Sequence, residues 1–312
     1  MSHRNKFGQI FSGKAVGSCA FDKLFSKSVP HVLEKIFFSL NNTSFKNCLD
    51  VNNTWNMLLT SVSFCKNAKV VFQKGINNDA NKLWLASERG CAEEVRSLIS
   101  SGMVDTNTIC RMYISTPLCE AARNDHTNVV QVLLDNGAEP NKANIYGTTP
   151  LHEATCNKNK EVVQLLLDKG ADPNKLGENG STPLIVAAFS ENKDVVQLLL
   201  DAGAEPNTAD NVGLFPLGIA VCGGNTNVAK VLLDGGANPN KVYSDGQTTI
   251  HTAAKFIKID MVKLLMNKGA DLNKEDNNGR TPLHMAAAAK MWHRNYDVVQ
   301  LLLDRGALKT QE

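Results

Sequence analysis

Apolar residues recur along residues 80–312 in a pattern with a period of 33. Each period opens with Thr-Pro-Leu or a close variant, and continues into a run such as Val-Val-Gln-Leu-Leu-Leu-Asp, whose apolar residues follow helical spacing. One position marks the register, and it is occupied by Pro117, Pro150, Pro183, Pro216, Thr249 and Pro282. This pattern predicts a series of helix-turn-helix units.

The residue types within one period explain how each unit folds. Thr149 is suited to cap a helix that Pro150 opens, because proline has a fixed φ and lacks the N–H that a first turn leaves unpaired. Leu151 and Ala154 are expected to face inward, and Gly170 to end the second helix in a left-handed conformation. Since one unit cannot bury both of its faces, the units must stack.

The unit GTTPLHEATCNKNKEVVQLLLDKGADPNK, which starts at Gly147, resembles the ankyrin repeat in its period and its T-P-L-H-x-A signature. The resemblance implies an all-α solenoid of about seven helix-turn-helix units with β-turn tips. The expected units are approximately 80–109, 110–143, 144–176, 177–209, 210–242, 243–275 and 276–312. The first unit lacks T-P-L-H and is expected to act as a cap.

Two spacings depart from the 33-residue period. Gly102 and Gly137 are 35 residues apart, and Gly269 and Gly306 are 37 apart. The four extra residues of the last unit fall near KMWHRNY, and we expect them to form an outward loop between its two helices.

The N-terminal part of the chain does not follow this period. We divide it into residues 1–28, a candidate for disorder, a helical module at 29–68, and a linker at 69–79. Within the module, one predicted helical face is formed by Val32, Leu33, Ile36, Phe37 and Leu40. A module of this size buries too little apolar surface to be robust alone.

The segment 29–59 resembles the F-box, although Val29 replaces the usual Leu and Asn52-Asn53 replace the usual Cys and basic residue. The family contacts carry over to Pro30, Leu33, Ile36, Leu40, Phe45, Val51 and Trp55. The resemblance implies that this segment docks on the Skp linker of a cullin-RING ubiquitin ligase, leaving the repeats to select a substrate. The alternative is that these residues pack a helical cap onto the first repeat.

The ankyrin resemblance also implies that a partner protein binds to the turn tips and first helices. The first two tips, Met112-Tyr113 and Ile145-Tyr146, place tyrosine beside an aliphatic residue, whereas we interpret the later tips as polar. A slot two residues after T-P-L is expected to be exposed, and it holds Glu120, Glu153, Val186, Ile219, Thr252 and Met285. The predicted target-binding residues are Met112, Tyr113, Glu120, Ile145, Tyr146 and Glu153. The alternative is that the two tyrosines pack on neighbouring tips.

A second candidate patch lies in the WHRNY loop, with Trp292 and Tyr296, which could instead cover the C-terminal end of the stack.

Charge and cysteine content narrow the classes of partner. The formal net charge is +2, divided as +6 for residues 1–79 and −4 for the rest, and this mixed charge argues against broad nucleic-acid binding. The eight cysteines include no C-x-x-C pair, so they predict neither zinc nor a disulfide framework but reduced thiols. No apolar run approaches the length of a membrane span, and the first residues do not form a convincing signal peptide. We expect a cytoplasmic or nuclear protein, or one acting in a host cell if it is a pathogen effector.

No catalytic, cofactor or metal site is predicted. His152, His251 and His284 all occupy the T-P-L-H slot, where the side chain typically bonds neighbouring backbone, and the solenoid step of about 10 Å separates them too far to share a metal. No phosphate-binding loop is present. The sequence therefore favours a non-enzymatic substrate receptor of a Skp-cullin-F-box ligase. The alternative is an ankyrin scaffold or inhibitor without a link to ubiquitin.

Overall fold

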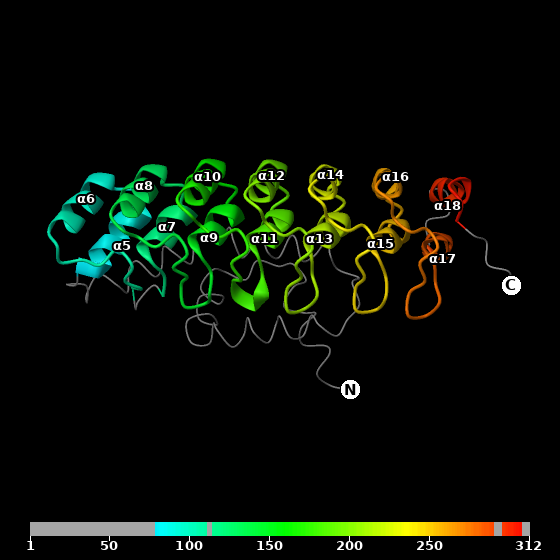
Figure 1. Cartoon of the computed structure of the whole chain (residues 1–312), viewed down its shortest axis with the longest axis horizontal. Helices are drawn as coiled ribbons and strands as arrows, with labels where there is room; N and C mark the ends of the chain where they lie inside the picture. Colours follow the sequence, from blue (N-terminus) through cyan, green and yellow to red (C-terminus); the bar gives the residue numbers. More distant parts are fainter. Residues whose placement is uncertain (1–78, 111–113, 290–294, 308–312) are drawn as a thin grey trace, which may run out of the picture. The chain divides into compact units, whose positions relative to one another are not determined.

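The repeats form a row of paired α-helices in this computed structural model, which describes residues 79–110, 114–289 and 295–307. In Figure 1 the first helices of the pairs form one row and the second helices form another, while the connecting loops project to one side. The pairs, numbered here as repeats one to seven, are α5 (Asp79–Arg89) with α6 (Ala92–Ser100), α7 (Pro117–Arg123) with α8 (Thr127–Asp135), α9 (Pro150–Cys156) with α10 (Lys160–Asp168), α11 (Pro183–Phe189) with α12 (Lys193–Asp201), α13 (Pro216–Gly223) with α14 (Thr226–Asp234), α15 (Thr249–Lys255) with α16 (Ile259–Asn267), and α17 (Pro282–Ala288) with α18 (Asn295–Asp304).

The tips between the pairs contain little regular structure. A short 3-10 helix, η1 (Glu178–Gly180), forms the tip of repeat four, and isolated β-bridges pair Cys110 with Ser115 and Val242 with Thr248. The part of the chain that the structure describes contains no β-strand, which confirms the all-helical prediction. It also contains no helix with the length and apolar character needed to cross a membrane.

Caps at both ends of the helices behave as the residue types predict. In repeat three the Thr149 hydroxyl accepts a bond from the backbone N–H of His152, and Pro150 occupies the first turn. The second helix ends at Asp168, and Gly170 follows with φ of +86°, in the left-handed region.

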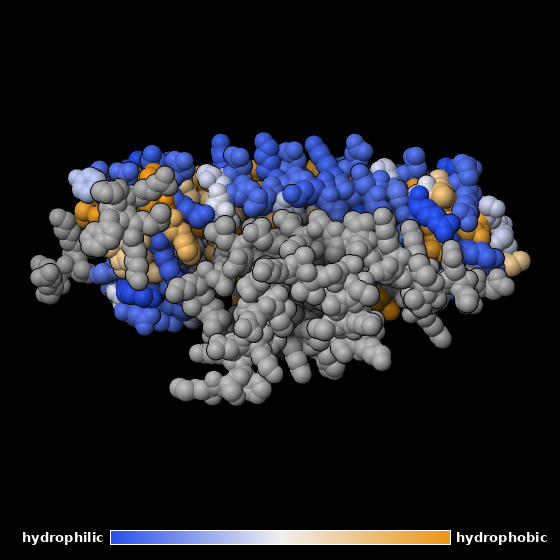
Figure 2. Space-filling view, turned by 180° about the vertical axis from the view of Figure 1, so that it is seen from behind, coloured by the Kyte–Doolittle hydropathy of each residue, from blue (hydrophilic) through white to orange (hydrophobic). Residues whose placement is uncertain are grey.

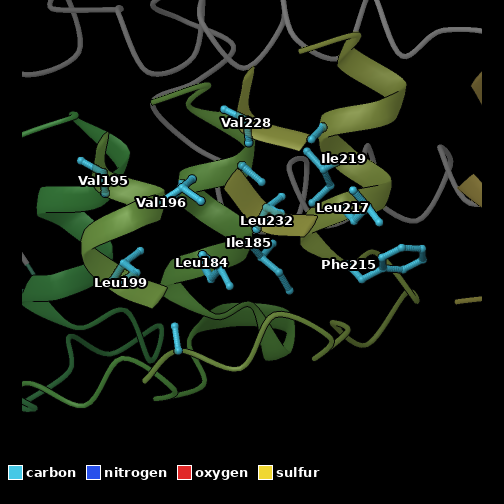
Figure 3. Packing of buried hydrophobic residues seen from close by; sticks show 14 of the residues in the cluster. Leu184, Ile185, Val195, Val196, Leu199, Phe215, Leu217, Ile219, Val228 and Leu232 are labelled. Carbon is cyan, nitrogen blue, oxygen red and sulfur yellow. The ribbon is translucent and has the colours of Figure 1, made fainter. Parts of the chain in front are cut away.

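The core lies between the two helices of each repeat and between neighbouring repeats. In repeat three, Leu151, Ala154, Val162, Val163 and Leu166 are fully buried. Figure 3 shows the same arrangement where α11 and α12 meet α13 and α14. Burying each large aliphatic side chain contributes roughly 1.5–3 kcal/mol, and every repeat depends on its neighbours for part of that burial.

Asparagine side chains connect the loops that follow successive second helices. Asn141 Nδ2 donates to the Gly170 carbonyl at 3.1 Å, and Asn141 Oδ1 accepts from the Asp172 N–H at 2.7 Å. Asn107, Asn174, Asn207 and Asn240 make the same two bonds to the next loop. Each amide therefore satisfies one donor and one acceptor of the following repeat.

Histidines in the T-P-L-H slot connect neighbouring tips, as predicted. Nδ1 of His152 accepts from the backbone N–H of Thr149 at 3.3 Å, so Nε2 carries the proton and donates to the Ser181 carbonyl at 3.0 Å. His251 makes the equivalent bond to the Arg280 carbonyl at 3.1 Å. Burial lowers the pKa of both imidazoles, which favours the neutral form that this bonding requires.

The two irregular spacings have different outcomes. In the first, one extra residue falls before Asn107, which follows Gly102 by five residues where Asn141 follows Gly137 by four. Residues 111–113 lie outside the described residues. In repeat seven, residues 289–294 separate α17 from α18, whereas only residues 256–258 separate α15 from α16. This confirms that the insertion falls between paired helices. Tyr296, which we placed in that loop, instead lies in the first turn of α18 and is exposed.

Several predictions concern residues that the structure does not describe. Residues 1–28, the F-box-like module at 29–68 and nearly all of the linker at 69–79 lie outside the described residues, as do Met112, Tyr113 and Trp292. Those predictions stay untested.

Repeat five meets repeat six differently from the way that repeat three meets repeat four. In repeats three and four a large residue, His152, faces Gly177, where an added Cβ would lie 2.8 Å from the imidazole. Two interfaces further along, between repeats five and six, the sizes are reversed, because Gly218 occupies the histidine slot and Tyr243 the position of Gly177. A Cβ on Gly218 would lie 2.6 Å from the Tyr243 hydroxyl oxygen. The Tyr243 ring packs on Phe215, with centroids 4.9 Å apart.

This exchange predicts a rescue. Gly218→His should lower the free energy of unfolding by about 1–3 kcal/mol, because the imidazole overlaps the Tyr243 ring. Adding Tyr243→Gly should recover most of that loss by recreating the pairing of His152 with Gly177. Urea unfolding of the two single variants and the double variant measures the coupling free energy. If the two single losses in free energy of unfolding simply added in the double variant, the side chains at positions 218 and 243 would not compete for the same space.

Candidate recognition surface on the tips and first helices

The tip of repeat three is held rigidly and presents two apolar side chains. Asn144 Oδ1 accepts from the N–H groups of Tyr146 at 2.9 Å and Thr148 at 3.0 Å, and the Ile145 N–H donates to the Ile114 carbonyl of the preceding tip at 3.2 Å. Ile145 is 57% exposed and Tyr146 is 44% exposed. The tip therefore offers an aromatic and an aliphatic side chain on a fixed backbone, as the sequence suggests.

Later tips are more apolar than we expected. Leu176, Val212 and Val242, at the tips of repeats four, five and six, are 48–58% exposed. Leu176 and Val242 lie four residues before the tip glycine, outside the dipeptide that we compared among repeats. Consecutive tips from repeat three to repeat six thus each expose an apolar side chain.

The slot two residues after T-P-L is not exposed, so that expectation is wrong. Glu120 and Glu153 are buried, as are the side chains at the same position of repeats five, six and seven. The physical reason is close packing, since the first helices of neighbouring repeats lie against each other. Of this slot only Val186, in repeat four, is half-buried.

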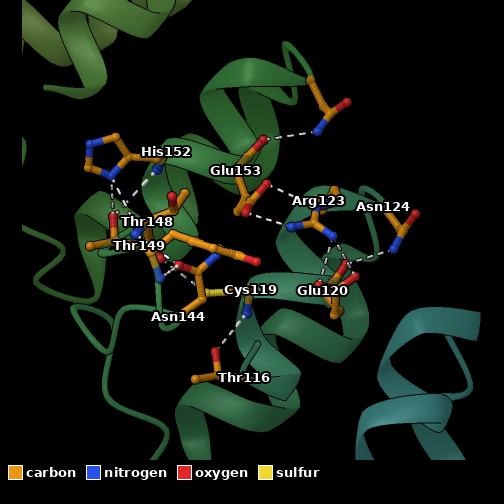
Figure 4. Close-up of polar contacts among 12 residues, drawn as sticks. Thr116, Cys119, Glu120, Arg123, Asn124, Asn144, Thr148, Thr149, His152 and Glu153 are labelled. Atoms are coloured by element: carbon orange, nitrogen blue, oxygen red, sulfur yellow. Dashed lines mark hydrogen bonds and ion pairs between the residues drawn. The ribbon is translucent and has the colours of Figure 1, made fainter. Parts of the chain in front are cut away.

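Arg123 joins the two buried glutamates across repeats two and three. Its Nε and Nη2 donate to the two carboxylate oxygens of Glu153, at 2.9 and 2.7 Å. Its Nη1 lies 2.9 Å from Oε1 of Glu120. Figure 4 shows the guanidinium between the carboxylates. The glutamate side chains are 5% and 11% exposed, while that of Arg123 is 40% exposed. A surface arginine therefore covers two buried acids, one more than its charge neutralises.

Burial, together with the neighbouring charges, changes the pKa of the Glu120 carboxyl. Burial raises the pKa of its carboxyl to about 7, and the charges of Glu153 and Glu88 act in the same direction, while Arg123 opposes them. The two carboxylates raise the pKa of the Arg123 guanidinium, so it stays charged. Near neutral pH the Glu120 carboxyl is therefore partly protonated.

The first-helix face changes character along the stack. After the charged cluster, repeats four and five present Val186, Phe189, Ile219 and Cys222, of which Ile219 is buried and the others are half-buried. Repeat six then presents Lys255, which is exposed. From repeat two to repeat six, this face therefore presents Arg123 above two buried glutamates, then half-buried apolar residues, and then the exposed Lys255.

The second helices form a different kind of surface. Figure 2 shows hydrophilic residues along the edge that these helices occupy. Exposed ion pairs join neighbouring second-helix ends, with Lys169 Nζ 2.8 Å from Asp135 and Lys268 Nζ beside Asp234. Such exposed pairs contribute little stability. Among the described second helices, α18 carries the exposed aromatic residue Tyr296.

Buried cysteines lack the properties of reactive sites. Cys119 is fully buried between repeats two and three, and burial raises the pKa of its thiol to about 12. Burial also raises the pKa of Cys156 to about 11. Within the described ranges, no three His, Cys, Asp or Glu side chains are grouped so as to hold a metal ion.

Comparison with known proteins agrees with this architecture. A family model described as "Ankyrin repeats (3 copies)" matches residues 46–144, 83–177, 118–210, 170–243 and 217–312. The chain belongs to the ankyrin repeat family, whose members generally bind protein targets. No curated protein sequence matches it.

Two solved structures illustrate the likeness. The ankyrin repeat domain of Bcl-3, described as a unique member of the IkappaB protein family, is 28% identical with a TM-score of 0.64, over 70% of this chain and 97% of that one. The human ASB11 ankyrin repeat domain is 26% identical with a TM-score of 0.61, over 73% of this chain and 99% of that one.

The Glu120 cluster predicts a pH-dependent stability. The folded-state pKa of about 7 lies above the usual 4.5, so Glu120 favours folding most below pH 4.5 and loses that contribution as pH rises through 7. The free energy of unfolding of Glu120→Gln minus that of the parent chain should therefore be larger at pH 8 than at pH 5, by on the order of 1–3 kcal/mol.

Urea unfolding at both pH values measures this difference. Glu161→Gln, which changes an exposed acid on α10, is the matched control and should show no such difference. If Glu120→Gln changed the free energy of unfolding equally at pH 5 and pH 8, the raised pKa of Glu120 would be contradicted.

Proposed function

We propose that this protein is a non-catalytic recognition module that binds another protein through the tips and first helices of its central repeats. The observation that carries the proposal is the succession of exposed apolar side chains on four consecutive tips, each attached to a hydrogen-bonded backbone. Apolar and aromatic side chains on a rigid support lose little entropy on binding, and such residues commonly anchor interfaces.

We further propose that the module selects substrates for a Skp-cullin-F-box ubiquitin ligase. Support comes from the F-box-like register of residues 29–59, in which Pro30, Leu33 and Trp55 fall at family positions. In this assembly the repeats would hold the target close to a ubiquitin-charged enzyme in another subunit, so positioning would replace side-chain chemistry.

A second candidate is an ankyrin scaffold or inhibitor whose N-terminal helices only cap the stack. One finding favours it: the ankyrin family match begins at residue 46 and so overlaps the F-box-like module at 46–68. A segment that belongs to the repeat array would cover the exposed side of repeat one. The two candidates therefore differ in what residues 29–68 contact.

Binding to the Skp linker separates the two candidates. The ligase proposal expects the full chain to co-purify with the linker, and expects Leu40→Glu with Trp55→Glu to abolish binding, because charges would replace apolar contacts. As a control, Ile145→Ser with Tyr146→Ser should leave linker binding intact. A parent chain that fails to bind the linker would rule out the ligase role and leave the scaffold.

The recognition proposal predicts loss of target capture when the tip of repeat three is altered. Ile145→Ser with Tyr146→Ser should weaken target binding at least tenfold, because two exposed apolar contacts disappear without change to the core. Gln164→Ser on the second-helix edge is the control. Binding can be measured by titrating the target identified by proximity labelling, and unaltered affinity of the tip variant would contradict the proposal.

A further inference from the structure

The boundary between repeats five and six is joined differently on its two sides. On the side of the first helices, the slot that holds His152 in repeat three is occupied by Gly218 in repeat five. His152 donates to the Ser181 carbonyl of the next tip at 3.0 Å, and Gly218 has no side chain that could make this bond. The rings of Phe215 and Tyr243 meet there instead, so a ring contact stands where the earlier boundary has a directional hydrogen bond.

The tip backbones show the same difference. Between repeats four and five, the Asn211 N–H donates to the Asn179 carbonyl at 3.0 Å. Between repeats six and seven, the Asn277 N–H donates to the Asp245 carbonyl at 3.1 Å. No such bond joins the tips of repeats five and six, both of which the structure describes. Among the boundaries from repeat three to repeat seven, whose tips lie within the described residues, only this one has neither the histidine bond nor the backbone bond.

Helix α13 of repeat five has little stability of its own. Thr149 and Thr182 cap α9 and α11 by accepting a backbone N–H, whereas Phe215 precedes α13 and gives it no side-chain cap. Gly218 lies in the interior of α13, where glycine disfavours a helix because it loses more conformational freedom on folding than other residues. The helix therefore depends on packing against its neighbours, including the Tyr243 ring of repeat six.

The second-helix side of the same boundary keeps its polar contacts. Asn240 Nδ2 donates to the Gly269 carbonyl at 3.0 Å, and Asn240 Oδ1 accepts from the Asp271 N–H at 2.7 Å. Lys268 also forms an ion pair with Asp234. Directional bonds thus hold the loops after α14 and α16 together.

We propose that the repeat array bends at the boundary between repeats five and six, with the loops after α14 and α16 as the pivot and the contact between α13 and α15 as the side that opens. A small gap is enough to weaken a ring contact, whereas the Asn240 bonds keep the loops in place. The exposed side chains of Val212 and Val242 lie on opposite sides of this boundary, so bending changes the spacing of the apolar tips. The bend is a property of the free chain, and it goes beyond the proposed recognition function without depending on it.

The test measures distances across the boundary by pulsed electron paramagnetic resonance on the full chain. Nitroxides are attached to ketone-bearing residues introduced by amber suppression, so the eight cysteines stay unchanged. One pair of labels, at positions 212 and 278, spans the boundary. The matched pair, at positions 146 and 212, has the same separation of 66 residues but lies outside it. All three positions are exposed and precede a tip glycine.

We expect the distance distribution of the pair at 212 and 278 to be at least about twofold broader than that of the matched pair, because only the first pair spans the opening side. Equal widths would overturn the proposal. A third pair, at the exposed positions 197 and 263 on α12 and α16, spans the same boundary on the pivot side and should give a narrow distribution. A broad distribution for this pair would rule out the pivot.

The role of the exchanged residues is tested with the double variant Gly218→His with Tyr243→Gly, which recreates the pairing of His152 with Gly177. Its distribution for the pair at 212 and 278 should narrow to the width of the matched pair. If it stayed broad while circular dichroism showed intact helices, the assignment of the bend to Gly218 and Tyr243 would be wrong.

Hydrogen exchange gives a second readout that needs no substitution. Opening removes the packing on which α13 depends, so we expect the α13 amides to exchange about tenfold faster than those of α11 in the parent chain. Mass spectrometry of peptides covering residues 216–223 and 183–189 measures this difference. Exchange of α13 that is no faster than that of α11 would contradict the proposal.

Discussion

Burial between neighbouring repeats is the interaction on which the rest of this structure depends. Leu166 and its counterparts in other repeats lose contact with water only when the next helix pair lies against them. That requirement fixes the 33-residue step, and the step sets the spacing of every tip and first helix. A binding surface made of one side chain from each repeat therefore inherits its geometry from the core.

Hydrogen bonds between repeats fix the relative orientation of stacked repeats, because each bond needs a defined geometry. The Asn141 amide and the His152 imidazole each join groups that stacking would otherwise leave without protein partners. Gly218 and Tyr243 show that the large and the small residue at this kind of interface can exchange places when the total volume is kept. Repeat five thus keeps the step while losing the histidine, and the stack continues without a break.

The sequence predicted the fold well because its determinants are local and repeated. Thr149, Pro150 and Gly170 act within one helix or one turn, so their types and spacing were sufficient. The recognition surface was predicted less well, because exposure depends on contacts between repeats. Glu120 and Glu153 occupy a variable position that we interpreted as exposed, yet they are buried against a neighbouring first helix and bound to Arg123. Leu176 was missed because it lies beside the compared dipeptide and not within it.

The buried cluster links stability to pH through a single charge. Two carboxylates on one guanidinium are less stable than one matched pair, because each buried charge needs a partner. Folding tolerates this excess near neutral pH by raising the pKa of Glu120 until the carboxyl is partly protonated. Protonation of Glu120 removes the same excess, because the neutral carboxyl leaves Arg123 with a single charged partner. The position that costs stability in the folded protein is therefore also the position at which stability responds to pH.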